Sequence, residues 1–282
     1  MKRKTKVLLI VTVLLLCLVL PGFYSALTIP HYTVEAEQIR QPVRIALITD
    51  LHSCAYGENQ RELLAALDGE NPDAVLLGGD IFDDTLPVDN AAAFLRGVGG
   101  RYPCYYVTGN HEYWVGAAGF AERMAILEEC GVTRLSGGTA ALEINGSRIV
   151  LCGVDDPYAW ADCDGFTEHA SGSFREQVAR TVSQAEPGAF TILLTHRPEL
   201  LDVYSQYGIG LVLAGHAHGG QWRIPGLVNG LWAPHQGLFP AYAGGQYEKN
   251  GVRMIVSRGL ARESTRVPRW YNRPELVMVE LR

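Results

Sequence analysis

Aspartate, asparagine and histidine residues gather in five short clusters that are widely separated along the chain. The clusters are Asp50 with His52, Asp80 with Asp83, Asn110 with His111, His196 alone, and His216 with His218. Imidazole nitrogens together with carboxylate and amide oxygens can bind a divalent metal ion. This mixture of donors suits manganese, iron or zinc better than calcium. The residue types therefore predict a metal site, provided that the fold brings the clusters together.

Each cluster follows an apolar run that predicts a buried β-strand. The five runs are residues 43–49, 74–79, 104–109, 189–195 and 209–215. In α/β proteins the carboxyl ends of the strands form the ligand-binding edge of a sheet. One such ending, such as Asp50-Leu51-His52, is ordinary loop polarity in most proteins. Five endings of the same kind predict a single shared site.

Helix-like segments separate the strands in the first half of the chain. Residues 59–72, 90–100 and 117–132 are amphipathic or close with glycine, and their alternation with strands predicts an α/β domain. Asn145-Gly146 then marks a β-hairpin. Further strands are expected to the end of the chain. We therefore predict two sheets packed face to face as a β-sandwich core, flanked by helices in a four-layer αββα arrangement.

The N-terminal segment differs from the rest of the chain. Residues 7–29 carry no charge, whereas Lys2, Arg3, Lys4 and Lys6 precede them. The run is long enough for a membrane span, which needs about 20 residues. Its aliphatic part would also suit a signal peptide, but no clear small-residue cleavage site follows. A buried helix of a soluble protein is not expected either, because no face of the run is polar. We predict an anchor or uncleaved signal with the remaining chain on the extracytoplasmic side.

The remainder is predicted to consist of a linker or first strand over residues 30–42 and one catalytic domain over residues 43–282. The formal net charge is −6, and no basic patch alternates with aromatic residues, so nucleic-acid binding is not expected. Six cysteines form no C-x-x-C pair, which gives no support to a cysteine zinc site. One disulfide is possible in an exported domain, and its pairing and the oligomeric state remain open.

In order and spacing, the clusters resemble the motifs of the calcineurin-like metallophosphoesterases. The matching motifs are Asp50-x-His52, Gly79-Asp80-x-x-Asp83, Gly109-Asn110-His111-Glu112, His196 and Gly215-His216-x-His218. The resemblance covers approximately residues 43–282. The segments "GHAHGGQ", "VSRGL" and "NRPELVMVEL" are similar to the bacterial membrane-associated or exported YkuE-like branch.

The resemblance implies a centre of two divalent metal ions, with manganese as the first expectation and iron or zinc as alternatives. The implied ligands are Asp50, His52 and His218 for one ion, Asn110, His196 and His216 for the other, and Asp80 as the bridge. A hydroxide bridging two such ions is a nucleophile near neutral pH. The implied reaction is the hydrolysis of a phosphoester.

The resemblance also gives His111 a role beside the metals. In the family the equivalent histidine faces the substrate phosphate and stabilises charge or protonates the leaving alkoxide. Asp83 matches the family position that orients this histidine, although Asp84 could compete for the role. The alternative is that His111 is a loop histidine bound to Glu112 or to a backbone carbonyl.

A protein phosphatase is a poor fit, because those relatives have Arg-Gly where this chain has Asp84-Thr85. A phosphodiester or small phosphomonoester is expected instead. The predicted anchor makes a lipid-linked or cell-envelope substrate plausible. Two other readings stay open, namely a catalytically silent scaffold with this fold and a dinuclear hydrolase that acts on amides.

Several other residues could reach the site, but each also has an ordinary structural explanation. Asp155 and Asp156 follow a strand, yet they also precede Pro157 and suit a turn. His31 and His169 are expected on the surface. The remaining candidates are His235, Arg262, Arg266, Asn272, Trp114, Trp160 and Trp222, which could contact substrate or a membrane, or could simply complete loops.

Overall fold

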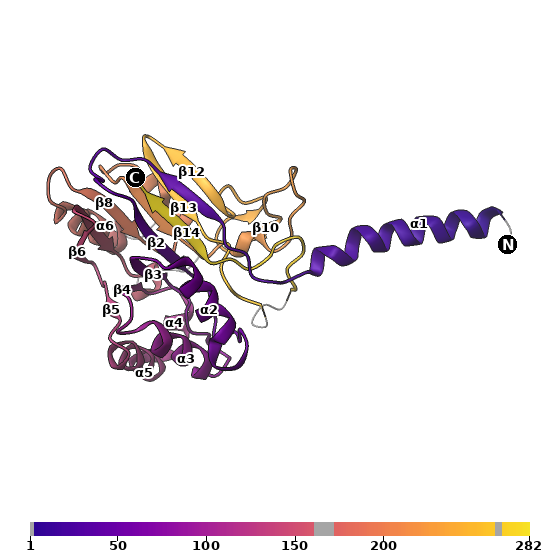
Figure 1. The fold of residues 1–282 in the computed structure, drawn as a ribbon, viewed down its shortest axis with the longest axis horizontal. Coiled ribbons are helices and arrows are strands. Elements are labelled where there is room, and N and C mark those ends of the chain that lie inside the picture. The colour runs from indigo at the N-terminus through magenta and orange to yellow at the C-terminus, as the bar shows by residue number, and fades with distance from the viewer. Residues whose placement is uncertain (1–2, 161–171, 263–266) are drawn as a thin grey trace.

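The computed structural model describes residues 3–160, 172–262 and 267–282. One helix, α1 (Arg3–Val19), continues into the short 3-10 helix η1 (Leu20–Phe23) and projects away from the body of the molecule (Figure 1). The apolar side chains described in α1 are exposed. All other described elements belong to the compact body.

The first sheet contains six strands. Their order is β1 (His31–Val34), β14 (Val277–Leu281), β2 (Val43–Ile48), β3 (Ala74–Gly78), β4 (Cys104–Val107) and β5 (Thr133–Arg134). All neighbours are parallel except β14 and β2. The parallel run from β2 to β5 follows from the strand-helix alternation of the sequence, because parallel neighbours need long crossover connections.

The second sheet also contains six strands. Their order is β12 (Gly245–Lys249), β13 (Val252–Val256), β9 (Leu211–Ala214), β8 (Phe190–Leu194), β7 (Ser147–Gly153) and β6 (Gly138–Ile144). β6 and β7 form the predicted hairpin, in which Asn145 and Gly146 have φ angles of 52° and 74°. Two positive φ angles are what a tight two-residue hairpin turn requires.

The two sheets pack against each other through alternating residues of their strands. Ile45 and Leu47 of β2 point into the core between the sheets, where they meet Leu151 and Ile192 of the second sheet. Ala46 and its alternating neighbours face the other way. Side chains alternate between the two faces of a β-strand, and both faces of β2 are buried, which explains why the strand is a nearly continuous apolar run.

Helices cover the outer face of each sheet. α2 (Arg61–Glu70), α3 (Asp89–Val98) and α5 (Gly116–Glu129) contribute apolar residues to a core on the first sheet. α6 (Gly172–Ser183) and α7 (Leu201–Tyr204) contribute to a core on the second. The predicted αββα sandwich is therefore confirmed.

The chain returns from the second sheet to the first between β13 and β14. Along this path the Leu260 N–H donates to the carbonyls of Thr49 and Asp50, both over 3.1 Å. The Glu275 N–H then donates to the Gly259 carbonyl over 3.1 Å. This connection covers the end of β2 and fixes the loop that carries the first predicted ligand.

Candidate metal centre

The predicted ligands lie at the ends of five strands drawn from both sheets. Asp50, Asp80 and Asn110 follow the parallel neighbours β2, β3 and β4. His196 and His216 follow the parallel neighbours β8 and β9. Both sheets thus deliver the carboxyl ends of their strands to one place, where ligands bind in α/β proteins.

The backbone at most of these positions is left-handed, a conformation that residues other than glycine rarely adopt. The φ angle is 50° at Asp50, 46° at His52, 51° at Asp80, 69° at His216 and 47° at His218. Each such residue costs on the order of 1–3 kcal/mol, and residues of this kind concentrate at functional sites. Their concentration here indicates that the loops are held for the direction of their side chains.

Asp50, His52 and His218 form one group of potential ligands, in which one donor atom of each lies within 4.8 Å of the others. All three side chains are buried. Nε2 of His218 lies 3.7 Å from Oδ1 of Asp50. The His216 N–H donates to the Asp50 carboxylate over 3.0 Å and fixes its direction. The group joins the loop after β2 to the loop after β9.

Asp80, His196 and His216 form a second group with the same spacing. Nε2 of His196 lies 3.1 Å from Oδ2 of Asp80 and 3.1 Å from Nδ1 of His216. Oδ2 of Asp80 also lies 3.6 Å from Nε2 of His52, which belongs to the first group. Asp80 therefore stands between the two groups.

Four buried atoms of the predicted ligands have no hydrogen-bond partner in the described structure. They are Nε2 of His52, Oδ2 of Asp80, Oδ1 of Asn110 and Nδ1 of His218. Oδ2 of Asp80 contacts histidines but makes no well-directed hydrogen bond. A buried polar atom left unpaired costs about 1–3 kcal/mol, and most such atoms are paired. These unpaired nitrogen and oxygen atoms can serve as metal ligands, and they fit a centre of two divalent metal ions.

Two of the histidines are held neutral by their surroundings. Burial and the nearby Arg197 lower the pKa of His216 well below its ordinary value. Burial and the nearby His52 have the same effect on the pKa of His218. Neutral imidazoles are ready to bind a cation, because a metal ligand must have a free nitrogen lone pair.

Carboxylates raise the pKa of the other two predicted ligand histidines, His196 and His52. Burial favours a lower pKa for His196, but the Asp80 carboxylate raises that pKa to about 10. Burial likewise opposes protonation of His52, but the hydrogen bond to Asp83 raises its pKa. A cation that binds to His196 at neutral pH must therefore displace a proton.

The second nitrogen of each of these histidines is also fixed. Nδ1 of His52 lies 3.1 Å from Oδ2 of Asp83, and Nδ1 of His196 lies 2.8 Å from the Gly78 carbonyl. Metal-binding histidines commonly donate their other N–H to a carboxylate or carbonyl, which fixes the tautomer. In both residues this arrangement directs Nε2 toward Asp80.

His111 lies at the edge of the centre. Its backbone N–H donates to Oδ1 of Asp80 over 2.9 Å, and its Nε2 lies 4.0 Å from Oδ2 of the same carboxylate. Of the two carboxylates that could orient the ring, Asp84 makes the hydrogen bond, at 2.7 Å from Nδ1, whereas Oδ2 of Asp83 lies 3.9 Å away. The half-exposed Trp114 ring lies against the imidazole, with 4.3 Å between the ring centroids.

Glu112 has a supporting position that the sequence analysis did not assign. It is fully buried, and it accepts hydrogen bonds from the N–H groups of Asp80, Phe82 and Gly109 at 3.1, 3.2 and 2.8 Å. Burial raises the pKa of this carboxyl to about 7. Glu112 thus connects the loop after β3 to the loop after β4. In the sequence, the only indication of this supporting role was its position directly after His111.

Arg197 is a second residue that the sequence analysis missed. It forms an ion pair with Asp156, in which Nη2 donates to Oδ1 over 3.0 Å. Its Nη1 lies 2.7 Å from Nδ1 of His235 and 3.1 Å from Nε2 of His216. His235 also approaches Nε2 of His216, to 2.8 Å. Arg197 and His235 therefore both contact Nε2 of His216, and Asp156 holds Arg197 in place. The position of Arg197 directly after His196 in the sequence did not predict these contacts.

The remaining candidates lie outside the two ligand groups. Asp155 accepts hydrogen bonds from Arg134 and Ser136. Asn272 donates to the His218 carbonyl over 2.7 Å and so closes the C-terminal connection. Arg262 forms hydrogen bonds with Cys54 and Ala55, and His31 forms one with Glu70. The Trp160 ring lies near Phe174, and the Trp222 ring lies near Trp270. His169 and Arg266 lie outside the described residues.

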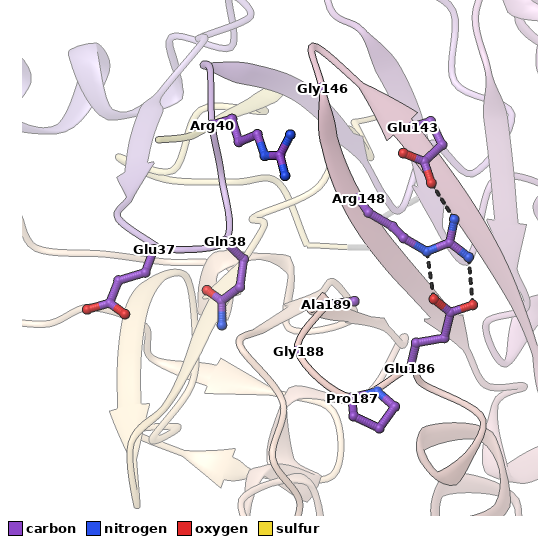
Figure 2. Close-up of a pocket in the computed structure, with 10 residues that line it drawn as sticks. All are labelled: Glu37, Gln38, Arg40, Glu143, Gly146, Arg148, Glu186, Pro187, Gly188 and Ala189. Atoms are coloured by element: carbon purple, nitrogen blue, oxygen red, sulfur yellow. Dashed lines mark hydrogen bonds and ion pairs between the residues drawn. The ribbon is translucent and has the colours of Figure 1, made fainter.

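Figure 2 shows a separate surface pocket, lined by residues around the turn before β2, the β6–β7 hairpin and the turn before β8. Arg148 occupies this pocket and pairs with Glu143 and Glu186. None of the predicted metal ligands lines it. The charge of Arg148 is therefore already balanced by two carboxylates.

Comparison with known protein families settles the class of this centre. The model of the family described as calcineurin-like phosphoesterase matches residues 43–220, which is more than half of the chain. The chain belongs to the calcineurin-like phosphoesterase family. It is therefore a metallophosphoesterase that hydrolyses phosphoric esters with bound metal ions, and the predicted family and class of enzyme are confirmed.

Bacterial relatives are described as metallophosphoesterases. An uncharacterized metallophosphoesterase of Bacillus subtilis, YkuE, is 27% identical over 247 residues, which cover 85% of this chain and 79% of that protein. An uncharacterized metallophosphoesterase of Helicobacter pylori is 28% identical over 247 residues, covering 84% of this chain but only 60% of the relative. The YkuE-like resemblance is thereby confirmed, while the chain covers less than two thirds of the longer Helicobacter pylori relative.

A solved structure supports the fold. The NAD nucleotidase NadN of Haemophilus influenzae superposes with a TM-score of 0.53 at 18% identity, covering 79% of this chain and 46% of that chain. At this level of identity the likeness concerns the architecture alone. The two-sheet sandwich with flanking helices is thus an arrangement found in a solved structure.

The packing at Gly109 predicts how the centre can be disrupted. A Cβ atom at this position would lie 2.2 Å from Oδ1 of Asp80 and 2.6 Å from its backbone nitrogen. We expect Gly109→Ala to displace the carboxylate and to lower the affinity for divalent metal at least about 10-fold, the scale at which misplaced ligands act. Isothermal titration of the metal-free protein measures this affinity.

Gly138→Ala is the matched control, because a Cβ atom there meets no atom within 4 Å. It should bind metal as the native protein does. Equal metal affinity in Gly109→Ala and the native protein would show that the packing of Gly109 does not position Asp80.

Proposed function

We propose that this protein hydrolyses a phosphodiester or phosphomonoester at a dinuclear centre built from the predicted ligands. The assignment is Asp50, His52 and His218 for one cation, Asn110, His196 and His216 for the other, and Asp80 shared between them. The observation that carries it is the convergence of unpaired buried donor atoms around Asp80. Two bound divalent ions supply an activated water near neutral pH and neutralise charge on the phosphate oxygens.

The chain's own contribution to proton transfer is assigned to His111. Its Nδ1 is engaged by Asp84, so its Nε2 faces the space beside Asp80. As an imidazolium the ring can donate the Nε2 proton to the leaving oxygen, and the Asp84 carboxylate stabilises the positive charge that this form carries. Asp83, which engages His52 instead, holds a metal-ligand side chain in place.

Manganese is our first proposal for the native metal, with iron or zinc as alternatives. Nitrogen and oxygen donors are present in nearly equal numbers among the assigned ligands, and such sets bind all three metals. No cysteine belongs to the groups of potential ligands found in the described residues. This absence of thiolate ligands favours manganese and iron over a zinc site of the structural kind.

We further propose that residues 4–23 anchor the protein in the cell membrane. These residues form a helix long and apolar enough to span a bilayer, and only 6% of its most apolar window is buried within the protein. A helix of a soluble core would be mostly buried, whereas this one lacks any protein partner along most of its length. The basic residues at its N-terminal end, Lys2, Arg3, Lys4 and Lys6, support an extracytoplasmic position for the catalytic domain.

The anchor suggests the kind of substrate. A domain held beside the membrane meets phosphate esters of lipids, of lipid-linked sugars and of cell-envelope polymers at high local concentration. We propose a lipid-linked or envelope phosphoester as the substrate. Arg197 is already paired with Asp156, so phosphate recognition depends on the metal centre and His111 rather than on this arginine.

The direct test uses the full chain in detergent micelles, stripped of metal and reloaded separately with Mn²⁺, Zn²⁺ or Fe²⁺. We expect metal-dependent hydrolysis of bis(p-nitrophenyl) phosphate or p-nitrophenyl phosphate. His111→Ala should lower kcat about 10²–10⁴-fold without loss of metal, the usual contribution of a general acid. Turnover that survives in metal-free protein, or that is unchanged in His111→Ala, would contradict the proposal.

The two neighbouring aspartates should have separable effects. Asp84→Asn weakens the support of His111, so we expect kcat to fall about 10-fold or more with unchanged metal affinity. Asp83→Asn weakens the support of His52, so metal affinity should fall about 10–100-fold. Asp68→Asn, at an exposed ion pair, is the control for both. If Asp84→Asn weakens metal binding as much as Asp83→Asn does, the assigned division of roles is wrong.

A further inference from the structure

Large apolar side chains are exposed in one part of the folded body. Beyond Tyr24, eight large hydrophobic residues are exposed in the described part of the chain, and six of them fall within residues 222–239. We call these six the apolar loop surface: Trp222, Ile224, Leu227, Trp232, Leu238 and Phe239. The exposed fraction reaches 84% at Leu227 and 68% at Leu238. Contiguous exposed apolar area of this kind commonly marks a contact with a partner or a membrane.

The residues of the apolar loop surface are joined by backbone hydrogen bonds. Trp232 pairs with Leu238 across the short hairpin of β10 (Trp232–Ala233) and β11 (Gly237–Leu238). Leu231 donates to the Trp222 carbonyl over 2.9 Å and accepts from the Phe239 N–H over 2.8 Å. The surface is therefore one connected unit of short turns.

This unit lies against the end of the proposed membrane helix. The Trp222 ring lies 6.1 Å from the Trp270 ring, and Nε1 of Trp270 donates to the Val19 carbonyl over 3.0 Å. The Tyr271 hydroxyl donates to the Leu18 carbonyl over 2.6 Å. In Figure 1, β10 and the near end of α1 accordingly lie at the same end of the molecule.

The composition of this end is typical of a membrane interface. Tryptophan and tyrosine concentrate where a protein crosses the boundary between lipid and water, because their rings are apolar and their N–H or O–H groups are polar. Trp270 and Tyr271 bind the last turn of α1, Trp222 lies beside Trp270, and Trp232 belongs to the hairpin that is hydrogen-bonded to this segment. Trp222 and Trp270 thus connect the apolar loop surface to the end of the proposed anchor.

We propose that the apolar loop surface inserts into the interfacial layer of the same bilayer that α1 crosses. This proposal rests on the anchor put forward above. The bilayer is the occupant that the structure favours, because the surface continues directly from the end of the span. A second copy of the chain, or a partner protein seated on the surface, is an alternative outcome of the test.

Such docking would orient the metal centre toward the lipid headgroups. The loop that carries His218 leads directly into Trp222, and His235 lies between the two paired strands of the hairpin. Nδ1 of His235 lies 2.8 Å from Nε2 of the predicted ligand His216. The apolar loop surface and the metal centre therefore share one segment of chain, so a phosphate ester at headgroup level would lie close to the ligands.

The test uses the full chain in nanodiscs made with lipids that carry bromine on the acyl chains, which quenches nearby tryptophan fluorescence. We expect quenching in the native protein. The double variant Trp222→Phe/Trp232→Phe should lose at least half of the quenched signal. Trp160→Phe is the control, because Trp160 packs near Phe174 away from this surface and should leave the quenched signal unchanged.

A second variant guards against misfolding in the first. Leu227→Glu adds a charge to an 84% exposed side chain, so it should fold normally and lower the quenching at least twofold. Gln38→Glu changes an exposed residue outside the apolar loop surface and should leave the quenching unchanged. Hydrolysis of the soluble diester should stay within twofold of native in both glutamate variants, which separates docking from catalysis.

The failure of docking and the failure of the anchor are distinguishable. Flotation of the full chain with vesicles at alkaline pH tests the anchor alone. If the protein floats but the Trp222→Phe/Trp232→Phe variant keeps the full quenched signal, the apolar loop surface does not touch lipid and the proposal is overturned. Chemical cross-linking of two copies through this surface, with no quenching, would also overturn it.

Discussion

Asp80 carries a buried negative charge on which the arrangement of the centre depends. Burial alone would raise the pKa of this carboxyl, but the adjacent His196 lowers it well below its ordinary value, so the group stays ionised. Oδ1 accepts from the His111 N–H, whereas Oδ2 lies among histidine nitrogens without a well-directed hydrogen bond. An isolated buried charge is costly, so positive charge must be close. Without metal, the protonated His196 supplies it, and a bound cation would replace that proton.

The surrounding structure holds Asp80 and the other predicted ligands in place. Glu112 holds the backbone of Asp80 and Gly109, and the left-handed loops turn the side chains of Asp50 and His216 inward. The sheets contribute rigid strand ends, and their shared core fixes the relative position of those ends. The strain in the loops is therefore supported by the stability of the sandwich, which is how strained backbone persists at functional sites.

The strand ends and the Asn145-Gly146 hairpin could be predicted because both are local: an apolar run followed by a polar residue, and a two-residue turn that needs positive φ angles. The pairing of side chains could not. Asp83 and Asp84 are adjacent, so which of them reaches His111 depends on the direction of the loop after β3. Arg197 and Asp156 come from distant segments, and only the folded chain brings them behind His216. Long-range polar contacts leave no periodic trace in a sequence.

The central claim is that Asp80 is shared by two metal ions. Crystals of the manganese-loaded protein, measured at a wavelength where manganese scatters anomalously, locate the ions directly. The account predicts two anomalous peaks about 3.5–4 Å apart, the separation of two-metal hydrolases, with the Asp80 carboxylate touching both. A single peak, or two peaks that share no contact with Asp80, would contradict it.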